Sequence, residues 1–550
     1  MSRRATRLGG GGALTLVCAA VIAAILLSSS SASDPRHVSD PRHGSDPRHG
    51  SDPPGAREAS TAGPIIPADP LRPGDPRAAV SVSATAVGSP IPSGFLGFSF
   101  EFQGVRAYTG SDPAHVNPVL VQLIRNLTPG QAPVLRIGGN STDVSFAAGP
   151  GVTPLPYQGY LLTQSWMDTT GALAKALGAR MIMGANLAAD DPKLVATEVR
   201  NYVLALPEGS IEAVEIGNEP NIYNKITVYH TASGKPVPAR PRTFGYRQFR
   251  GQFHELANQT EPLKLAGPAL AVGPTPGPGS WINDVADLMR REPRLSPMTV
   301  HRYPLRNCFV PSSSPQYPSI AHLLSSYATV SLAGSLKRWI AIAHGQHRKL
   351  RVDELNSVAC RGRAGVSDTF ASALWVTDAL FGLARAGVDG VNMHTLPNAA
   401  YELFQFTHRG GVWQAQVRPV YYGLELFAQA APPGAQLLGV SRQGADTGLS
   451  VWATRAPDHK VRIVVINKSQ TQRKTVSVGL PAGAGKSATV ERLLAPSVAA
   501  KGGVTLGGRT YGATTQTGRL RAPEVSPASI TQGRVTLSMP RASAALVTAG

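Results

Sequence analysis

The stretch IEAVEIGNEP, residues 211–220, decides how the chain is interpreted. Ile211 to Ile216 form a short apolar run of the kind that makes a fully buried strand. Gly217, Asn218, Glu219 and Pro220 follow, and proline takes the chain out of a sheet because it has no N–H to donate. The stretch therefore predicts a buried strand that ends on an amide and a carboxyl group at the rim of a core.

A second stretch has the same form. Residues 349–357, KLRVDELNS, are another short strand-like run, and it ends on the carboxylate of Glu354. Glu219 and Glu354 are too far apart in the sequence for a local ion pair, so only the fold brings them together. Two carboxylates on the ends of two buried strands suggest a pair that does acid–base and nucleophilic work.

Strands and helices alternate through the middle of the chain. Helical periodicity marks residues 166–177, 250–257 and 370–386. Eight strand-like segments are found at residues 95–102, 133–139, 179–187, 211–219, 263–268, 298–303, 349–354 and 388–395. This number and alternation predict an α/β fold, a (β/α)8 TIM barrel, over residues 94–415.

Polar side chains recur where the predicted strands end. In a parallel barrel, the working residues lie at the carboxyl ends of the strands. The residues at those positions are Glu101, Arg136, Asn140, Asn218, Glu219, His301, Tyr303, Glu354 and His394. Two carboxyl groups that act as proton donor and nucleophile are the machinery of glycoside hydrolysis. For that chemistry we expect Arg136 to hold Glu354 in its charged form, Tyr303 to donate to the same carboxylate, and Asn218 to bind a sugar hydroxyl. His301 and His394 are interpreted as residues that pack at the rim or contact hydroxyl groups, and not as metal ligands, because no Asp/His cluster has the spacing of metal ligands.

The pattern of hydrophobic and polar residues changes near residue 416. Short alternating segments separated by Gly, Pro, Asn and Asp predict an all-β sandwich over residues 416–550. A lone alternating segment precedes the barrel, and we expect residues 78–93 to form a strand that pairs with this β-domain.

The N-terminal residues indicate export. Residues 1–33 combine three arginines with a 15-residue apolar run from Ala13 to Leu27, which predicts a signal peptide or, alternatively, an uncleaved membrane anchor. Residues 34–77 are a Pro-rich segment with SDPRHG repeats, which we interpret as a disordered linker. The protein is therefore expected outside the cell or at its surface, with a membrane tether as a possibility.

The distribution of charge argues against one class of function, and the cysteines predict a disulfide. The formal net charge is +19, but the chain has no Lys/Arg-dense run after residue 60, which argues against binding of nucleic acid. Apart from Cys18, the chain has two cysteines, Cys308 and Cys360. They follow the sixth and seventh predicted strands, so we expect a disulfide between neighbouring loops over the site.

Five stretches in order carry a resemblance to a known family. They are FLGFSFEF (95–102), LRIGGNSTD (135–143), EIGNEPN (215–221), the run from Val352 to Leu380 and VRPVYYGLELF (417–427). The chain resembles glycoside hydrolase family 79, the β-glucuronidase and heparanase-like group of the retaining clan with catalytic glutamates on barrel strands four and seven. The resemblance implies that Glu219 is the acid/base and Glu354 the nucleophile.

The same resemblance implies a substrate and some alternatives. It implies a glycan or glycoside with β-linked glucuronic acid, or its 4-O-methyl ether, at the non-reducing end, and no metal or cofactor. Donors to the uronate carboxylate are expected from the backbone of the Cys360–Arg363 turn, with Arg361 as a further candidate. Two other functions stay open: a glycosidase of the same clan acting on neutral sugars, such as an arabinofuranosidase or xylosidase, and a non-catalytic glycan-binding protein of the cell surface.

Overall fold

A computed structural model describes residues 70–550, apart from residues 154, 156, 158, 278–279 and 444–447. The predicted signal or anchor (1–33) and all but the last residues of the predicted linker (34–77) lie outside the described residues. The chain divides into two compact units. Of the first unit only His230–Val237 is described. There the N–H of Gly234 donates to the carbonyl of Thr231, and the N–H of Thr231 donates to the carbonyl of Lys235, which closes a tight turn. The second unit, Ala62–Tyr229 with Pro238–Gly550, contains the barrel, the β-domain and the candidate site.

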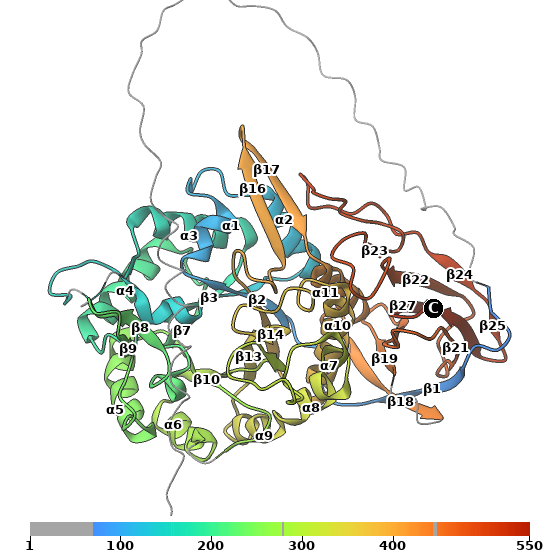
Figure 1. Cartoon of the computed structure of the whole chain (residues 1–550), viewed down its shortest axis with the longest axis horizontal. Coiled ribbons are helices and arrows are strands. Elements are labelled where there is room, and N and C mark those ends of the chain that lie inside the picture. The colour runs from blue at the N-terminus through green and yellow to red at the C-terminus, as the bar shows by residue number, and fades with distance from the viewer. Residues whose placement is uncertain (1–69, 154, 156, 158, 278–279, 444–447) are drawn as a thin grey trace, which may run out of the picture. The chain divides into compact units, whose positions relative to one another are not determined.

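Eight parallel strands close into a barrel, as the sequence predicts (Figure 1). Each strand is a short apolar run buried on both faces, as expected for a parallel sheet covered by helices. In chain order, which is also the order around the barrel, they are β2 (Leu96–Glu101), β3 (Val134–Gly138), β6 (Arg180–Ala185), β7 (Ile211–Ile216), β10 (Leu265–Ala271), β11 (Leu295–His301), β13 (Leu350–Leu355) and β15 (Gly390–Thr395).

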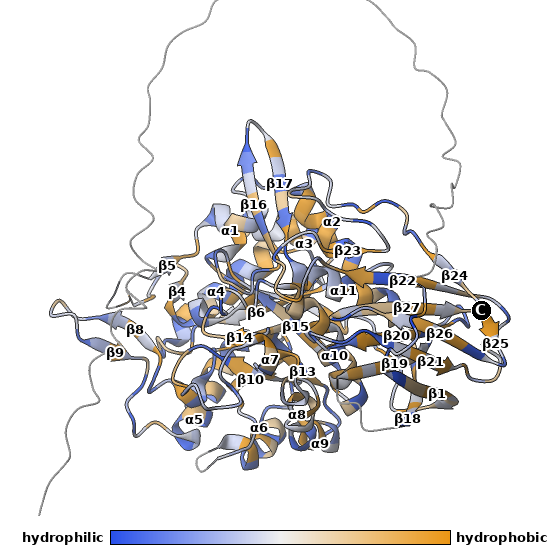
Figure 2. Ribbon diagram, turned by 45° about the vertical axis from the view of Figure 1, so that its right-hand side comes forward, coloured by the Kyte–Doolittle hydropathy of each residue, from blue (hydrophilic) through white to orange (hydrophobic). Residues whose placement is uncertain are grey.

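Helices connect the strands and cover the barrel. A typical one is α5 (Tyr246–Ala257), whose ribbon mixes hydrophobic and hydrophilic residues (Figure 2). It buries Phe249 and Phe253 and leaves polar residues such as Gln248 and Glu255 exposed. The others are α1 (Gly104–Thr109), α2 (Pro118–Leu127), α3 (Gln164–Leu177), α4 (Pro192–Ala205), α6 (Val285–Arg291), α7 (Ile320–Leu323), α8 (Val330–Gly334), α9 (Lys337–Gly345), α10 (Phe370–Ala386) and α11 (Pro419–Ala430). Among the described residues, no helix has both the length and the apolar character needed to cross a bilayer.

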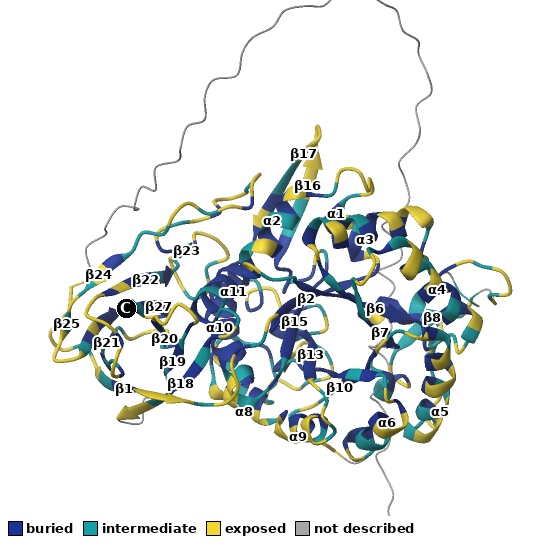
Figure 3. Ribbon diagram, turned by 180° about the vertical axis from the view of Figure 1, so that it is seen from behind, coloured by how far each residue is buried: buried dark blue, intermediate teal, exposed yellow. Residues whose placement is uncertain are grey.

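The last two helices are buried around most of their circumference (Figure 3). They pack closely because Gly423 of α11 has no side chain: a Cβ there would lie 2.2 Å from the carbonyl oxygen of Ala373. Asp378 of α10 ties the barrel to the β-domain, since its carboxylate accepts hydrogen bonds from Lys468 Nζ at 2.8 Å and Trp452 Nε1 at 2.8 Å. Helix α11 thus carries the helical layer past residue 416, where the sequence placed the start of the β-domain.

After α11 the described C-terminal region is all β, as predicted. One sheet has the strand order β23-β22-β27-β20-β19-β18-β1-β21-β26-β25, with β24 paired to β22. Both arms of this sheet contribute to one apolar core, so it curls on itself as a sandwich. Its strands are β1 (Arg77–Ala86), β18 (Gln436–Gln443), β19 (Leu449–Arg455), β20 (Val461–Asn467), β21 (Lys474–Gly479), β22 (Ala488–Leu494), β23 (Thr505–Leu506), β24 (Ser526–Ala528), β25 (Ile530–Thr531), β26 (Arg534–Met539) and β27 (Ser543–Ala549).

The N-terminal strand pairs with this sheet, also as predicted. Strand β1 lies between β18, to which it is antiparallel, and β21, to which it is parallel. Small two-stranded sheets in the loops were not predicted. They are β4 (Ser145–Phe146) with β5 (Tyr160–Leu161), β8 (Thr227–His230) with β9 (Pro236–Pro238), β12 (Leu305–Arg306) with β14 (Val358–Ala359), and β16 (Phe404–Arg409) with β17 (Val412–Val417).

Candidate active site

Glu219 stands just past the end of β7 in an unusual backbone conformation. Its φ of 54° lies in the left-handed region, which is costly for a residue with a side chain. The backbone N–H of Glu219 donates to the carbonyl of Ala269 on β10 at 2.9 Å, which fixes this turn. Its side chain is 17% exposed, so it reaches both the barrel interior and solvent.

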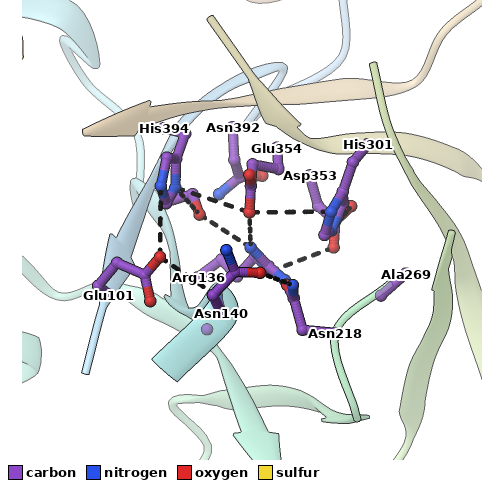
Figure 4. A network of polar contacts seen from close by, with 12 residues as sticks. Glu101, Arg136, Asn140, Asn218, Ala269, His301, Asp353, Glu354, Asn392 and His394 are labelled. Carbon is purple, nitrogen blue, oxygen red and sulfur yellow. Dashed lines mark hydrogen bonds and ion pairs between the residues drawn. The ribbon is translucent and has the colours of Figure 1, made fainter. Parts of the chain in front are cut away.

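Glu354 lies within β13, and both of its carboxylate oxygens accept hydrogen bonds. Arg136 Nη1 donates to Oε2 at 2.9 Å, and the hydroxyl of Tyr303 donates to Oε1 at 2.8 Å. Nδ1 of His301 and Nδ1 of His394 each lie 3.8 Å from Oε2 (Figure 4). The side chain remains 12% exposed, which leaves it accessible to a ligand above the barrel.

These neighbours determine the charge of Glu354. Burial alone raises the pKa of a carboxyl group, but His394, His301 and Arg136 and the hydrogen bond from Tyr303 together lower the pKa of Glu354 well below its usual range. The carboxylate is therefore ionised at neutral pH, the state that a nucleophile requires.

Arg136 is the fully buried centre of the site (Figure 4). Its Nε donates to Glu215 Oε2 at 2.6 Å, Nη1 to Glu354, and Nη2 to Asn218 Oδ1 at 2.8 Å. Burial acts to lower the pKa of Arg136, but the surrounding carboxylates, Glu215 most of all, outweigh it and keep the guanidinium charged. One cation thus orients side chains from β7 and β13 together.

A β-bulge in β13 turns two consecutive carboxyl groups toward the barrel interior. Strand β13 has one residue more than its neighbours here: Val300 pairs with Val352, but His301 pairs with Glu354. The register to β15 shifts at the same place. Side chains normally alternate along a strand, and a bulge re-aims one of them. Asp353 and Glu354 therefore both face Arg136, whose Nε is 3.4 Å from Asp353 Oδ2.

Asp353 and Glu215 form a buried pair beneath Glu354. Burial raises the pKa of Asp353 well above its usual range, and the neighbouring Glu215 raises it further. For Glu215, burial acts in the same direction but Arg136 outweighs it, so the pKa of Glu215 is lowered. Asp353 thus keeps its proton and Glu215 is ionised, with Thr299 Oγ1 also donating to Glu215 at 2.8 Å.

His301 lies between the two carboxylates that the sequence singled out. Its Nδ1 is 3.1 Å from Glu219 Oε1. One carboxylate oxygen of Glu219 and one of Glu354 lie within 4.8 Å of each other and of the imidazole. Retaining glycosidases hold their two carboxyl groups at about 5–5.5 Å, whereas inverting enzymes leave room for a water molecule at about 6.5–9.5 Å. The spacing therefore suits direct attack by one carboxylate on a sugar.

Three other predicted strand-end residues, Glu101, Asn140 and Asn218, lie next to one another in the site. Asn218 Nδ2 donates to Asn140 Oδ1 at 3.0 Å, and the backbone N–H of Asn140 donates to Glu101 Oε1 at 3.2 Å. Glu101 also faces His394, whose Nε2 is 3.7 Å away. The structure thus joins Glu101, Asn140 and Asn218 to Arg136 in one polar network.

The loops after β11 and β13 are joined by the Cys308–Cys360 disulfide, as predicted. Cys360, Arg361 and Gly362 all have left-handed φ angles, which makes the tight turn past Glu354. The expectation that the whole turn offers free N–H groups is wrong: Gly362 donates to the Val358 carbonyl and Arg363 to Ser367 Oγ. The side chain of Arg361 is also engaged, because its Nη2 donates to the carbonyl of Pro397, in the loop after β15, at 3.3 Å.

Sequence reasoning missed Asp353, Glu215, Asp143 and Tyr401. An aspartate inside the apolar run LRVDEL is the signal that points to Asp353. Asp143 ends the LRIGGNSTD stretch and accepts from the backbone of Asn218 at 3.1 Å; burial raises the pKa of Asp143 to about 6. Tyr401 comes from the loop after β15, and its ring lies 5.7 Å from that of His394, a proximity that no local pattern indicates.

Comparison with known proteins agrees with this geometry. Residues 451–546 match the glycosyl hydrolase family 79 C-terminal beta domain. A β-glucuronidase of Neurospora crassa is 23% identical over 520 residues, which cover 82% of this chain and 90% of that protein.

Solved structures share the fold. A 4-O-α-L-rhamnosyl-β-D-glucuronidase from Fusarium oxysporum 12S superposes with a TM-score of 0.66 at 17% identity and covers 85% of this chain and 100% of its own. The GH51 arabinofuranosidase from Xanthomonas axonopodis pv. citri gives a TM-score of 0.60 at 15% identity, with 86% and 100% covered.

Proposed function

Since the chain belongs to glycoside hydrolase family 79 and is a glycoside hydrolase, we propose that it hydrolyses β-D-glucuronides with retention of configuration. The observation that carries this proposal is the unequal environment of two neighbouring carboxyl groups. Glu354 is held ionised by Arg136 and Tyr303, and Glu219 lies within 4.8 Å of it against an imidazole.

In the first step, Glu354 attacks the anomeric carbon and Glu219 gives a proton to the leaving oxygen. The bond to the aglycone breaks, and a covalent glycosyl-enzyme forms on Glu354. In the second step, Glu219 takes a proton from water, whose oxygen attacks the same carbon and releases Glu354 as a carboxylate. Arg136 stabilises the departing carboxylate, since its Nη1 is already 2.9 Å from Glu354 Oε2.

A uronate substrate is supported by the two glucuronidases among the similar proteins. Its carboxylate needs donors near the sugar C5. With the amides of Gly362 and Arg363 used within their turn, we assign this role to the Tyr401 hydroxyl and to the backbone N–H groups of Cys360 and Arg361. Tyr401 lies beside Tyr303, with 6.3 Å between ring centroids, and therefore next to the nucleophile.

An activity panel tests the proposal. Purified protein is given chromogenic β-D-glucuronide, 4-O-methyl-β-D-glucuronide, β-D-xyloside and α-L-arabinofuranoside, and NMR follows the anomer first released. We expect turnover of the glucuronides with the β-anomer as first product. Turnover of only the neutral glycosides overturns the substrate class, release of the α-anomer overturns the mechanism, and turnover of none favours a glycan-binding protein.

We further propose that the protein is exported, with its N-terminal segment removed or kept as a tether. The basic and apolar N-terminal residues support this, and a disulfide is typical of an oxidising compartment. Mass spectrometry of the N-terminus from culture medium and from membranes tests it. Protein found only in the cytoplasm contradicts export.

A further inference from the structure

A line of polar side chains runs from Glu219 into the barrel. Nδ1 of His301 is 3.1 Å from Glu219 Oε1, and Nε2 on the other side of the ring is 3.6 Å from Asp353 Oδ1. His301 and Asp353 are both buried, and their side chains lie next to each other (Figure 4). The imidazole therefore bridges a side chain that reaches solvent and one that does not.

Within the part of the chain that the structure describes, His301 Nε2 and both carboxylate oxygens of Asp353 are buried without a hydrogen-bond partner. The 3.6 Å approach of Nε2 to Oδ1 is the contact that can satisfy two of these three atoms. Four ionisable groups face Asp353: Glu215 from β7, Arg136 from β3, His301 from β11 and Glu354 beside it on β13. The guanidinium of Arg351 on β13 also acts on it from a distance.

The proton count follows from these neighbours. Arg136 is a single cation among three carboxyl groups, and its short contacts go to Glu215 and Glu354. A third charge on Asp353 would be buried without a donor, which is costly. A neutral Asp353 instead donates its proton to Glu215 and leaves Oδ1 free to accept from His301.

We propose that Asp353 is a positioning residue for the acid/base: as a neutral carboxyl group it donates to Glu215 and accepts the Nε2–H of His301, which fixes the imidazole tautomer with Nδ1 bare toward Glu219. This inference rests on the proposed function of Glu219.

The tautomer matters in both steps. A bare Nδ1 at 3.1 Å from Glu219 Oε1 leaves room for one proton between the two atoms. Glu219 gives that proton to the leaving group in the first step. The unprotonated Nδ1 then faces the Glu219 carboxylate, which favours the uptake of a proton from water by Glu219 in the second step. The opposite tautomer would donate to Glu219 and favour its ionised form.

Substitutions at Asp353 test the proposal. Asp353→Asn keeps one donor toward Glu215 and one acceptor toward His301, so we expect kcat within about threefold of wild type and the same pH profile. Asp353→Leu removes both contacts at similar volume. We expect kcat to fall by about 10- to 100-fold, KM to change little, and the alkaline limb of the profile to move down by about one pH unit.

Thr299→Val is the matched control. It removes a further donor to Glu215, at 2.8 Å, and the acceptor of the Ala269 N–H, but none of the atoms of the His301–Asp353 contact. We expect lower stability and an alkaline limb at the wild-type pH. An Asp353→Asn variant as damaged as Asp353→Leu would show that Asp353 works as an anion and would overturn the proposal, as would a folded Asp353→Leu protein with the wild-type profile.

A measurement without substrate covers variants that do not fold. In wild-type protein with ¹⁵N-labelled histidine, the His301 ring, assigned by its loss in His301→Gln, is expected as the neutral Nε2–H tautomer. The Nδ1–H tautomer or an imidazolium at neutral pH overturns the proposal. Since no glycoside is needed, an Nε2–H tautomer in a protein that hydrolyses none of the panel refutes the proposed function alone.

Discussion

The two carboxyl groups of the site are held in opposite ways. Glu354 belongs to a barrel strand, and both of its oxygens accept hydrogen bonds, from Arg136 and Tyr303. Glu219 stands past a strand end in a left-handed backbone, and His301 is the partner of its side chain among the described residues. A single closed barrel thus holds Glu354 in a cage of fixed donors, Arg136 and Tyr303, and Glu219 on a less constrained turn.

The difference matches two chemical needs. A nucleophile must be ionised and aimed at one carbon, so fixed donors and a nearby cation suit it. An acid/base changes its protonation state twice in each cycle, so strong fixed donors that favour the ionised state would hinder it. The four predictions below test this contrast, from the largest expected effect to the smallest.

Replacing Glu354, the carboxyl group inside the cage, should cause the largest loss of activity. We expect Glu354→Gln to lose about 10⁴-fold or more in kcat, without rescue by azide. The smaller Glu354→Gly leaves space for azide, and the product should then be the α-glycosyl azide, identified by NMR. A β-azide would mean that Glu354 is not the nucleophile.

Removing Glu219 should give a loss that depends on the leaving group. For Glu219→Ala we expect about 10³-fold loss on an alkyl glucuronide, which needs a proton donor, but no more than about tenfold loss in the first step with a dinitrophenyl leaving group. Stopped-flow kinetics of both substrates separates the two. Equal losses on both would show that Glu219 is not the acid.

Tyr303→Phe should weaken the cage around Glu354 while leaving Glu354 itself in place. It removes one of the donors that hold the pKa of Glu354 low. Because activity requires ionised Glu354 and is lost as the pH falls through its pKa, raising that pKa moves the acidic limb of kcat/KM upward, by about one pH unit. We expect about tenfold lower kcat. An acidic limb that stays in place while kcat falls would contradict this account of the cage.

The disulfide should matter more for stability than for chemistry. Cys308–Cys360 links the loops that follow Tyr303 and Glu354. In the loop-entropy account, Cys308→Ser with Cys360→Ser lowers the free energy of unfolding by about 3–4 kcal/mol. We expect a lower Tm by calorimetry and only a few-fold change in kcat/KM. A loss of activity as large as that of Tyr303→Phe, at a temperature where the variant is folded, would place the disulfide within the cage.

The barrel could be predicted because its strands are apolar runs buried on both faces, and most of them carry a polar residue at or just past their end. Glu219 and Glu354 were found in this way. Asp353 was not, because strict alternation places it on the face opposite Glu354, and only a register shift against two neighbouring strands turns it inward.

Other parts of the site depend on loops. Tyr401 reaches the site from a separate loop after β15, and the sequence has no period or motif that indicates its approach. The turn at 360–363 was placed correctly, but whether its amides are free depends on partners such as Ser367 Oγ. The position of a strand is thus encoded in its local sequence. Which backbone N–H groups remain free at the rim of the barrel depends on how the loops pack together.

The place of β1 has a consequence for synthesis. It is made before the barrel, yet its parallel partner places Gly479 beside Ser81, about 400 residues later in the chain. At a ribosome rate of about 5–20 residues per second, β1 waits roughly 20–80 seconds for that partner. The β-domain is therefore sealed only when the chain is nearly complete, and a product truncated before residue 474 leaves one edge of β1 open.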